Sequence, residues 1–411
     1  MLKIQSRRAS KTLNLNDAFL FFVLFCALRL DSINYIFPLR RLFYYYAPLA
    51  ILLISLALFI ITKAQRSSVI YFTIALFGLY FFSTVLRSPG NAYSALSNFA
   101  APLAIALLAE MNMRRRPLHF LRVLQALFVT LMLVDLLTIF LFPQGLYASA
   151  LYTQNWLLGY KSARVRAVTL PAIAVAGLLD VYDYGKPRLR FILISVLAIL
   201  DTYLSSATAG TLVCLFEFTA IMVMFFLRTN WIRRLAKRLF NVKALLLIVV
   251  GLNLFFVFFQ AFQNNAWIEY VIVELLEKNM TLAGRLKIWT VSIDQFRNAW
   301  LIGNGYISGN QYILLTGVRG GTQPHNLVLA ILVYTGLAGL LLYSILLVLT
   351  LRRADVKGRS FSTICAVSVF ANLLFGITSM NFFGQFHYAM MVMLYYLSIH
   401  EKSEAFGAKL S

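Results

Sequence analysis

The sequence predicts an all-α, polytopic membrane protein with about twelve transmembrane helices and a long helical outer loop. Of its 411 residues, 61% are hydrophobic and only 13% are charged. A soluble domain carries roughly 25% charged residues, so this chain has too little polar surface to cover a globule in water. Apolar runs of about 20 residues, long enough to cross a bilayer as helices, recur along the whole chain. They are continuous rather than alternating, which favours helices over the strands of a membrane barrel.

Hydropathy divides the chain into three regions. Residues 1–262 hold nine predicted spans, residues 263–324 form a large outer loop, and residues 325–411 hold three spans and a short tail. Within the loop, amphipathic helices are expected over 266–279 and 284–299. The predicted spans are 17–37, 45–62, 69–86, 91–110, 121–142, 165–181, 190–206, 208–227, 243–262, 325–350, 361–379 and 383–399.

The charge distribution predicts the orientation of the chain. It carries 37 Lys and Arg against 15 Asp and Glu, a net charge of +22. The basic residues cluster between spans, which is typical of positive-inside topology and does not call for a nucleic-acid partner. With the N-terminus inside, the inner segments hold more than twice as many Lys and Arg residues as the outer ones. We therefore expect both termini inside and the loop at 263–324 on the extracytoplasmic face of a bacterial inner membrane.

His325 is the first candidate for chemistry, because it lies at the predicted outer end of the tenth span, directly after Pro324. Pro324 is expected in the first turn of that helix. The positive end of a helix favours a neutral imidazole that can accept a proton, and its free N–H groups favour a bound anion. A neutral base beside an anion suits glycosyl or acyl transfer from a phosphate-linked donor. The alternative is an ordinary interfacial histidine that caps the helix.

Three arginines are candidates for binding phosphate. Arg164 and Arg166 precede the sixth predicted span, and Arg285 begins the second loop helix. A guanidinium group binds phosphate with two parallel hydrogen bonds and keeps its charge at any working pH. The alternative is that these side chains anchor the protein at the membrane interface.

Carboxylates and aromatic residues form the remaining candidates. Asp135, Asp201 and Glu217 lie within spans, where they are expected to pair with arginines, to bind substrate hydroxyls or to relay protons in a transporter. Tyr147, Tyr152, Trp156 and Tyr160 fill the polar stretch before the sixth span. They are expected either to stack on sugars or to form an interfacial aromatic belt. Cys26, Cys214 and Cys365 all lie in apolar runs, so no disulfide or metal framework is expected.

Four short motifs follow one another through the outer loop and the tenth span. They are Gly284-Arg285-Leu286-Lys287-Ile288-Trp289, Leu301-Ile302-Gly303-Asn304-Gly305-Tyr306, Pro324-His325-Asn326 and Tyr334-Thr335-Gly336-Leu337-Ala338-Gly339. Their order, spacing and predicted side of the membrane resemble the O-antigen ligase and polymerase superfamily of bacterial envelope proteins. The resemblance covers about residues 284–343.

The resemblance implies a glycosyltransferase that uses no metal or other cofactor and acts on polyprenyl-diphosphate-linked glycans. It implies that Arg285, with Arg164 or Arg166, holds the diphosphate of the donor and that His325 orients or deprotonates the acceptor hydroxyl. Asp201 and Trp289 would support the site, and Asn326 would shape the start of the helix. The partners would be a polyprenyl-diphosphate-linked oligosaccharide donor, a glycan or lipid A–core acceptor and the lipid bilayer.

Three functions remain open at this stage. A polymerase would join lipid-linked repeat units into O-antigen, capsule or exopolysaccharide, whereas a ligase would move the glycan to lipid A–core or another acceptor. Many family members carry a Ser-Arg pair between the seventh and eighth spans, where this chain has Leu204-Ser205-Ser206-Ala207-Thr208. The absent arginine favours the polymerase. The charged residues within spans also suit a transporter or flippase, which would not need His325.

Overall fold

The computed structural model describes residues 15–36, 40–62, 66–149, 152, 154–226, 284–318, 320–352 and 361–410, together with a few residues between 231 and 253. The predicted loop helix at 266–279 and most of the predicted span at 243–262 lie outside the described residues. The described residues form an all-α bundle without strands, which confirms the predicted fold class.

Eight helices of the described chain are long and apolar enough to cross a membrane. They are η1 with α3 (Leu42–Tyr46 and Ala47–Ile61), α4 (Ser68–Arg87), η2 with α5 (Pro89–Asn91 and Ala92–Arg115), α6 (Pro117–Leu141), α7 with η3 and α8 (Lys161–Arg164, Val165–Thr169 and Leu170–Tyr184), α10 (Thr208–Phe226), α16 (Leu327–Leu351) and α17 (Phe361–Thr378). The other α-helices of the described chain are α1 (Leu15–Ala27), α2 (Asp31–Ile36), α9 (Leu189–Leu204), α14 (Arg285–Asn298), α15 (Gly309–Thr316) and α18 (His387–Leu410).

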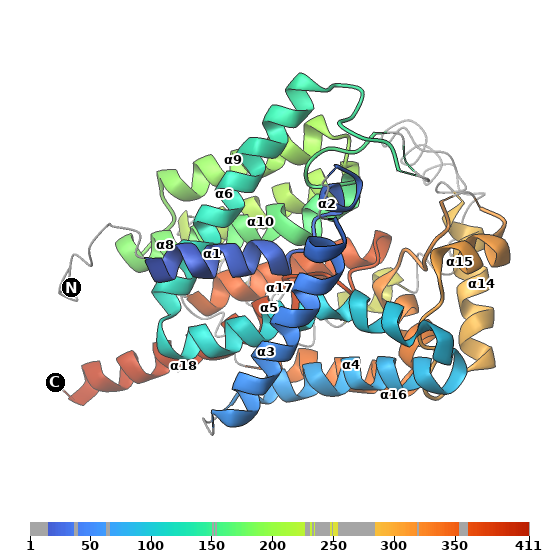
Figure 1. The fold of residues 1–411 in the computed structure, drawn as a ribbon. Coiled ribbons are helices and arrows are strands. Elements are labelled where there is room, and N and C mark those ends of the chain that lie inside the picture. The colour runs from blue at the N-terminus through green and yellow to red at the C-terminus, as the bar shows by residue number, and fades with distance from the viewer. Residues whose placement is uncertain are drawn as a thin grey trace.

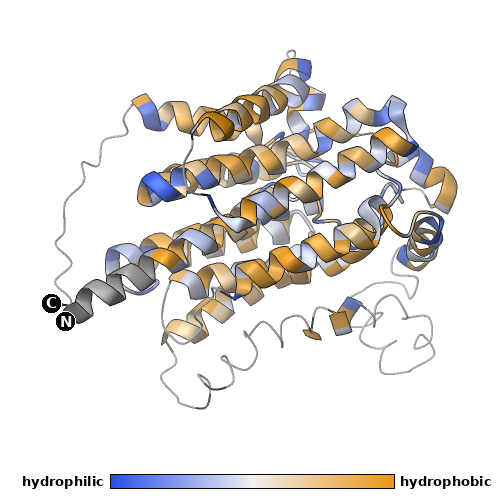
Figure 2. Cartoon of the chain, turned by 90° about the horizontal axis from the view of Figure 1, so that it is seen from below, coloured by the Kyte–Doolittle hydropathy of each residue, from blue (hydrophilic) through white to orange (hydrophobic). Residues whose placement is uncertain are grey.

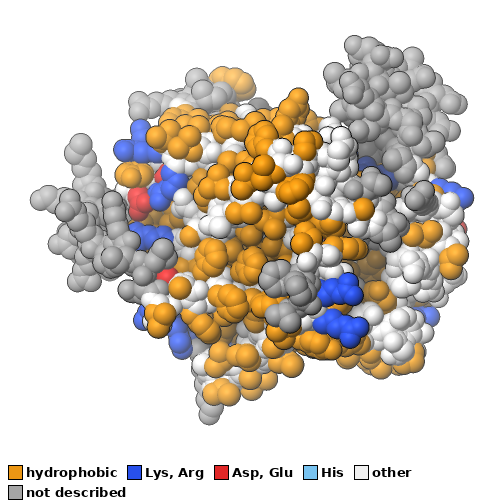
Figure 3. Space-filling view, turned by 45° about the horizontal axis from the view of Figure 1, so that its top comes forward, with side chains coloured by type: hydrophobic (Ala, Val, Ile, Leu, Met, Phe, Trp, Pro, Cys, Tyr) orange, Lys and Arg blue, Asp and Glu red, His pale blue; other side chains and the backbone are white. Residues whose placement is uncertain are grey.

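The surface of the bundle is apolar over much of its area. Hydrophobic residues run along the lengths of the long helices (Figure 2). One face of the molecule is a broad hydrophobic surface with Lys and Arg toward its margins (Figure 3). On α3, Leu53, Ile54, Ile60 and Ile61 are all exposed. Such side chains face lipid at no cost, whereas in water they would favour aggregation.

The two ends of the bundle differ in what they carry (Figure 1). Helix α1 begins and α18 ends at one end, and the short helices α14 and α15 lie at the other. Helix α14 packs against α16, which lies alongside α4. The described part of the loop is thus gathered over a single end of the long helices.

The structure corrects three predictions of local structure. The first predicted span, 17–37, is broken into α1 and α2 around Arg29, whose φ is +52°. Helix α16 begins at Leu327, so the placement of Pro324 in its first turn is wrong. Helix α15 was not expected, because its sequence between two glycine-rich turns has no clear apolar period.

A second break interrupts α16 at Gly336, whose φ is +63°. A break in a membrane helix leaves backbone groups without partners, which costs several kcal/mol each in hydrocarbon. Here the loop at 300–305 supplies the partners. Asn304 and Gly305 donate backbone hydrogen bonds to the carbonyls of Val333 and Tyr334, and Trp300 and Leu301 accept from the amides of Leu337 and Ala338, all at 2.8–3.0 Å.

The glycines of the loop at 300–305 allow its backbone to lie directly against the backbones of α16 and α4. Gly303 and Gly305 both have positive φ, which favours glycine. A Cβ at Gly303 would overlap the backbone of α16, and a Cβ at Gly305 would overlap the backbone of Thr84 in α4. The glycine motifs therefore hold the loop between α4 and α16, and this contact positions the segment that follows.

Candidate functional site

A cavity of about 400 Å³ lies where α14 and the segment before α16 meet the α7–η3 turn and the α9–α10 turn. Arg285, from the start of α14, and His325 both line it. Tyr152, Tyr160, Lys161, Ser206, Thr208, Gly320, Phe375 and Ser379 also contribute to its walls. The structure thus brings two of the predicted site residues, which are 40 positions apart in the chain, to one cavity.

His325 is held in a strained backbone conformation outside the helix. Its φ is +51°, an uncommon value for a residue with a side chain. Its Nε2 lies 3.3 Å from the carbonyl oxygen of Gly320. This contact favours the tautomer with the proton on Nε2, which leaves Nδ1 as an acceptor.

The environment of His325 opposes its protonation. Burial lowers its pKa to about 4, and the positive charges of Arg285 and Arg166 act in the same direction. We expected the positive end of the helix to keep the imidazole neutral. Desolvation is the first cause instead, since the ring lies two residues before the helix begins.

Arg285 lies beside the aromatic wall of the cavity. Burial lowers the pKa of its guanidinium, while Tyr160 and Tyr152 raise it. The rings of Tyr152 and Tyr160 are stacked, with centroids 3.5 Å apart and planes 12° apart. No described carboxylate lies within 4 Å of Arg285, so its positive charge is available to an anionic ligand.

Arg166 lies close to this cavity but lines a neighbouring one. Its guanidinium donates to the carbonyl oxygen of Met380 at 3.3 Å, and its Nε has no hydrogen-bond partner. Its charge acts on both His325 and Tyr152. Arg166 is therefore within electrostatic reach of the groups that surround Arg285.

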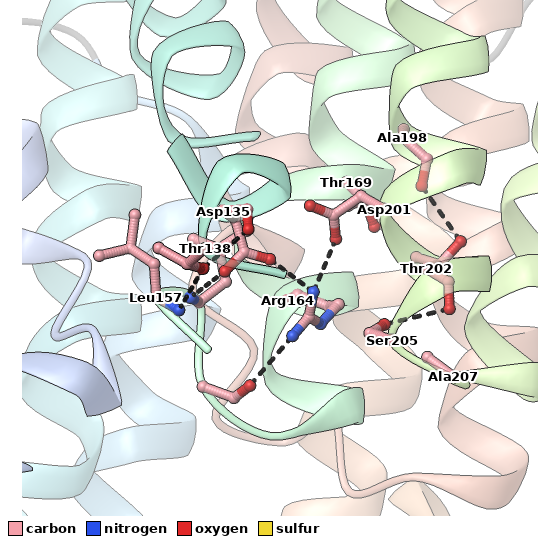
Figure 4. A network of polar contacts seen from close by, with 12 residues as sticks. Asp135, Thr138, Leu157, Arg164, Thr169, Ala198, Asp201, Thr202, Ser205 and Ala207 are labelled. Carbon is pink, nitrogen blue, oxygen red and sulfur yellow. Dashed lines mark hydrogen bonds and ion pairs between the residues drawn. The ribbon is translucent and has the colours of Figure 1, made fainter. Parts of the chain in front are cut away.

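Arg164, in contrast, is bound to carboxylates inside the bundle (Figure 4). It is fully buried and donates from Nη1 to Asp135 of α6 at 2.5 Å and to Asp201 of α9 at 3.0 Å. Its Nη2 donates to the carbonyl oxygen of Gly159. With two carboxylates around it, Arg164 is paired inside the bundle and does not line the cavity of Arg285 and His325. Of the three carboxylates predicted within spans, Asp135 and Asp201 therefore pair with an arginine, which is one of the roles expected for them.

Two further predicted residues, Trp289 and Asn326, lie near the site but do not line the cavity. Trp289, on α14, is buried and does not line the cavity. Asn326 is the N-cap residue of α16, where its side-chain oxygen accepts from the amide of Leu329 at 3.0 Å. Its amide group donates to the carbonyl of Ile377 in α17 at 3.0 Å. Asn326 thereby fixes the chain directly after His325.

Backbone strain is concentrated around this site. Among the described residues, Arg29, Ser206 and His325 are the non-glycine residues with positive φ. Ser206 and His325 line the cavity, and Arg29 lines the neighbouring one. Strained residues persist where the surroundings hold them, and they cluster at functional sites. Sequence reasoning did not find Ser206, because nothing in its local sequence indicates the strain.

A comparison with protein families identifies part of the chain. Residues 193–344 match the model of a family described as O-antigen ligase. Over this segment the chain is similar to that family. The predicted resemblance to the ligase and polymerase superfamily is thereby confirmed, and the match supports a function of ligase or polymerase type on lipid-linked glycans. No curated protein and no solved structure matches the chain.

The segment that matches this family contains one side of the cavity. Arg285, His325 and the α9–α10 turn fall within residues 193–344, whereas Tyr152, Tyr160 and Arg166 precede them. Within the described residues, no group of three or more His, Cys, Asp and Glu side chains comes together. Arg285 and Lys161 are the Lys and Arg residues among those that line the cavity.

Proposed function

We propose that this chain is a membrane glycosyltransferase that polymerises polyprenyl-diphosphate-linked repeat units into a surface polysaccharide such as O-antigen, capsule or exopolysaccharide. The observation that carries the proposal is the cavity that Arg285 and His325 share, since both residues fall within the segment that matches the O-antigen ligase family. We place this cavity, with the loop at 263–324, on the extracytoplasmic face of a bacterial inner membrane. Residues 1–262 and 325–411 form the membrane part in this proposal.

The proposed reaction forms one bond and breaks one. An acceptor hydroxyl oxygen attacks the anomeric carbon of the donor sugar, and the bond from that carbon to the diphosphate oxygen breaks. Nδ1 of His325 accepts the hydroxyl proton, and the polyprenyl diphosphate leaves with the bonding electron pair. Arg285 stabilises the charge that develops on the leaving oxygen, and Arg166 contributes from the neighbouring cavity. Positive charge from arginines makes a metal ion unnecessary in this scheme.

Donor binding would prepare His325 for this role. An imidazole whose pKa is about 4 is a weak base in the free protein. A diphosphate beside Arg285 would offset the positive charge that lowers this pKa. The base would therefore strengthen when the donor arrives.

Alanine substitutions test this proposal. We expect Arg285→Ala and His325→Ala each to lower the rate of glycan polymerisation by about 10²-fold or more, as for other charge-stabilising and acid–base groups. Arg297→Ala is the matched control, because Arg297 lies on the same helix but is exposed and paired only with Asp294. Full activity in both Arg285→Ala and His325→Ala would overturn the proposal.

A ligase is the second candidate, because the family match is compatible with a ligase as well as with a polymerase. Both enzymes would bind the same donor and differ in the acceptor. A deletion strain separates them by the glycan that remains on the cell surface. Single repeat units that are still attached indicate the polymerase, and loss of all attached glycan indicates the ligase.

A further inference from the structure

A second cavity, of about 200 Å³, lies against the break between α1 and α2. Its walls include Arg29, Asp31, Asn98, Arg166, Tyr306, Gln323 and Gln385. Neighbouring residues of three segments line the two cavities: Val165 and Arg166, Gln323 and His325, and Ser379 and Met380. The second cavity is therefore adjacent to the site of Arg285 and His325.

The break in the first helix builds one wall of this cavity. Arg29 donates to the carbonyl of Ser97 and to the side chain of Asn98, and its guanidinium stacks on Tyr44 at 4.5 Å. Tyr44 in turn donates to Asp31 at 3.0 Å. These contacts hold the charged segment around Arg29 in a strained backbone conformation. Strain of this kind costs free energy and is typical of preorganised binding sites.

Three of the residues that line this cavity carry a buried polar atom without a protein partner. The Nε atoms of Arg29 and Arg166 and Oε1 of Gln385 are buried and make no hydrogen bond. No described carboxylate lies within 4 Å of either guanidinium, in contrast to Arg164, which is paired with two. Buried polar groups are almost always satisfied, so these three side chains, all of which line the cavity, are incompletely paired within the protein.

The set of side chains indicates which polar ligand fits. The amide, phenol and guanidinium groups that line the cavity offer hydrogen-bond donors and acceptors in many directions. Its charged residues are one carboxylate, Asp31, and two arginines, Arg29 and Arg166. If Arg166 serves the neighbouring diphosphate, Arg29 and Asp31 leave the rest of this cavity close to neutral. Such a lining matches the hydroxyls of a sugar, and the volume is below the ~300 Å³ of sites for drug-sized ligands.

We propose that this cavity binds the sugar residue that is joined to the diphosphate of the lipid-linked donor. The inference rests on the proposed function, because it assumes that the diphosphate lies at Arg285. Arg166, at the boundary of the two cavities, would then contact both the diphosphate and the first sugar. The break at Arg29 becomes a specificity-determining element for that sugar.

Binding measurements on the full chain in lipid nanodiscs test this subsite. The probes are polyprenyl diphosphate without a sugar and the repeat-unit lipid that accumulates in a strain lacking this protein. The double variant Tyr306→Phe/Gln323→Ala removes two polar groups for which no side-chain hydrogen bond is seen. We expect it to bind the repeat-unit lipid at least tenfold more weakly than wild type and polyprenyl diphosphate equally well. Tyr93→Phe, an exposed tyrosine, is the control.

Two results would overturn the subsite. One is a double variant that melts like wild type and binds both lipids normally. The other is a double variant that loses both lipids equally, which would place the diphosphate in this cavity. Arg285→Ala separates the two proposals, since it should weaken both lipids. If Arg285→Ala binds both normally, the proposed function fails instead.

Discussion

The lowered pKa of His325 makes the stability of the protein depend on pH in the acid range. Its pKa is lowered from the ordinary 6.5 to about 4, so the unfolded chain takes up this proton first as pH falls. The residue therefore lowers the free energy of unfolding between about pH 6.5 and pH 4, on the order of 1–3 kcal/mol in full. We expect the melting temperature of wild type to fall more steeply over this range than that of His325→Gln. Parallel melting curves would show that the imidazole titrates normally.

Arg164 illustrates the opposite kind of arginine, one that stabilises the bundle. Replacing it by methionine leaves Asp135 and Asp201 buried without their cation, at a cost of about 3–5 kcal/mol. We expect Arg164→Met to lower the yield of folded protein and its melting temperature. The triple variant Arg164→Met/Asp135→Asn/Asp201→Asn should recover much of the loss. Arg297→Met, which breaks an exposed pair, should melt like wild type.

The glycines of two sequence motifs meet where the loop at 300–305 contacts the break in α16. Alanine at Gly303 or Gly336 would have to adopt positive φ and would overlap backbone across the contact. We expect each substitution to destabilise the protein by about 2–5 kcal/mol, measured by thermal unfolding in detergent. Gly78→Ala in α4 is the control, because nothing lies within 4 Å of its Cβ. Equal melting of all three variants would show that the glycines do not serve this contact.

The orientation of the whole molecule in the membrane can be tested with single cysteines. The native cysteines Cys26, Cys214 and Cys365 are buried, so they give little background labelling. A membrane-impermeant maleimide should label Asn298→Cys, at the exposed end of α14, in intact cells. Arg115→Cys, at the exposed end of α5, should react only after permeabilisation. The reverse pattern would place the site of Arg285 in the cytoplasm.

The fold class and most helix positions could be predicted from the amino-acid sequence, because both depend on local composition. A bilayer of fixed thickness demands apolar runs of fixed length, and the chain contains them. The helix predicted at 284–299 is present as Arg285–Asn298 for the same local reason. The order of the motifs also sufficed to indicate the family that matches residues 193–344.

Which charged residues contact one another could not be predicted from the sequence and became clear from the folded chain. Arg164 and Arg166 are two positions apart and equivalent by composition, yet one is bound by Asp135 and Asp201 and the other lines a cavity. The role of Arg29 likewise depends on a helix break and on Asn98, which lies 69 positions away. The Coulomb energy between two charges depends on their distance and burial, and these are set by helix packing rather than by spacing along the chain.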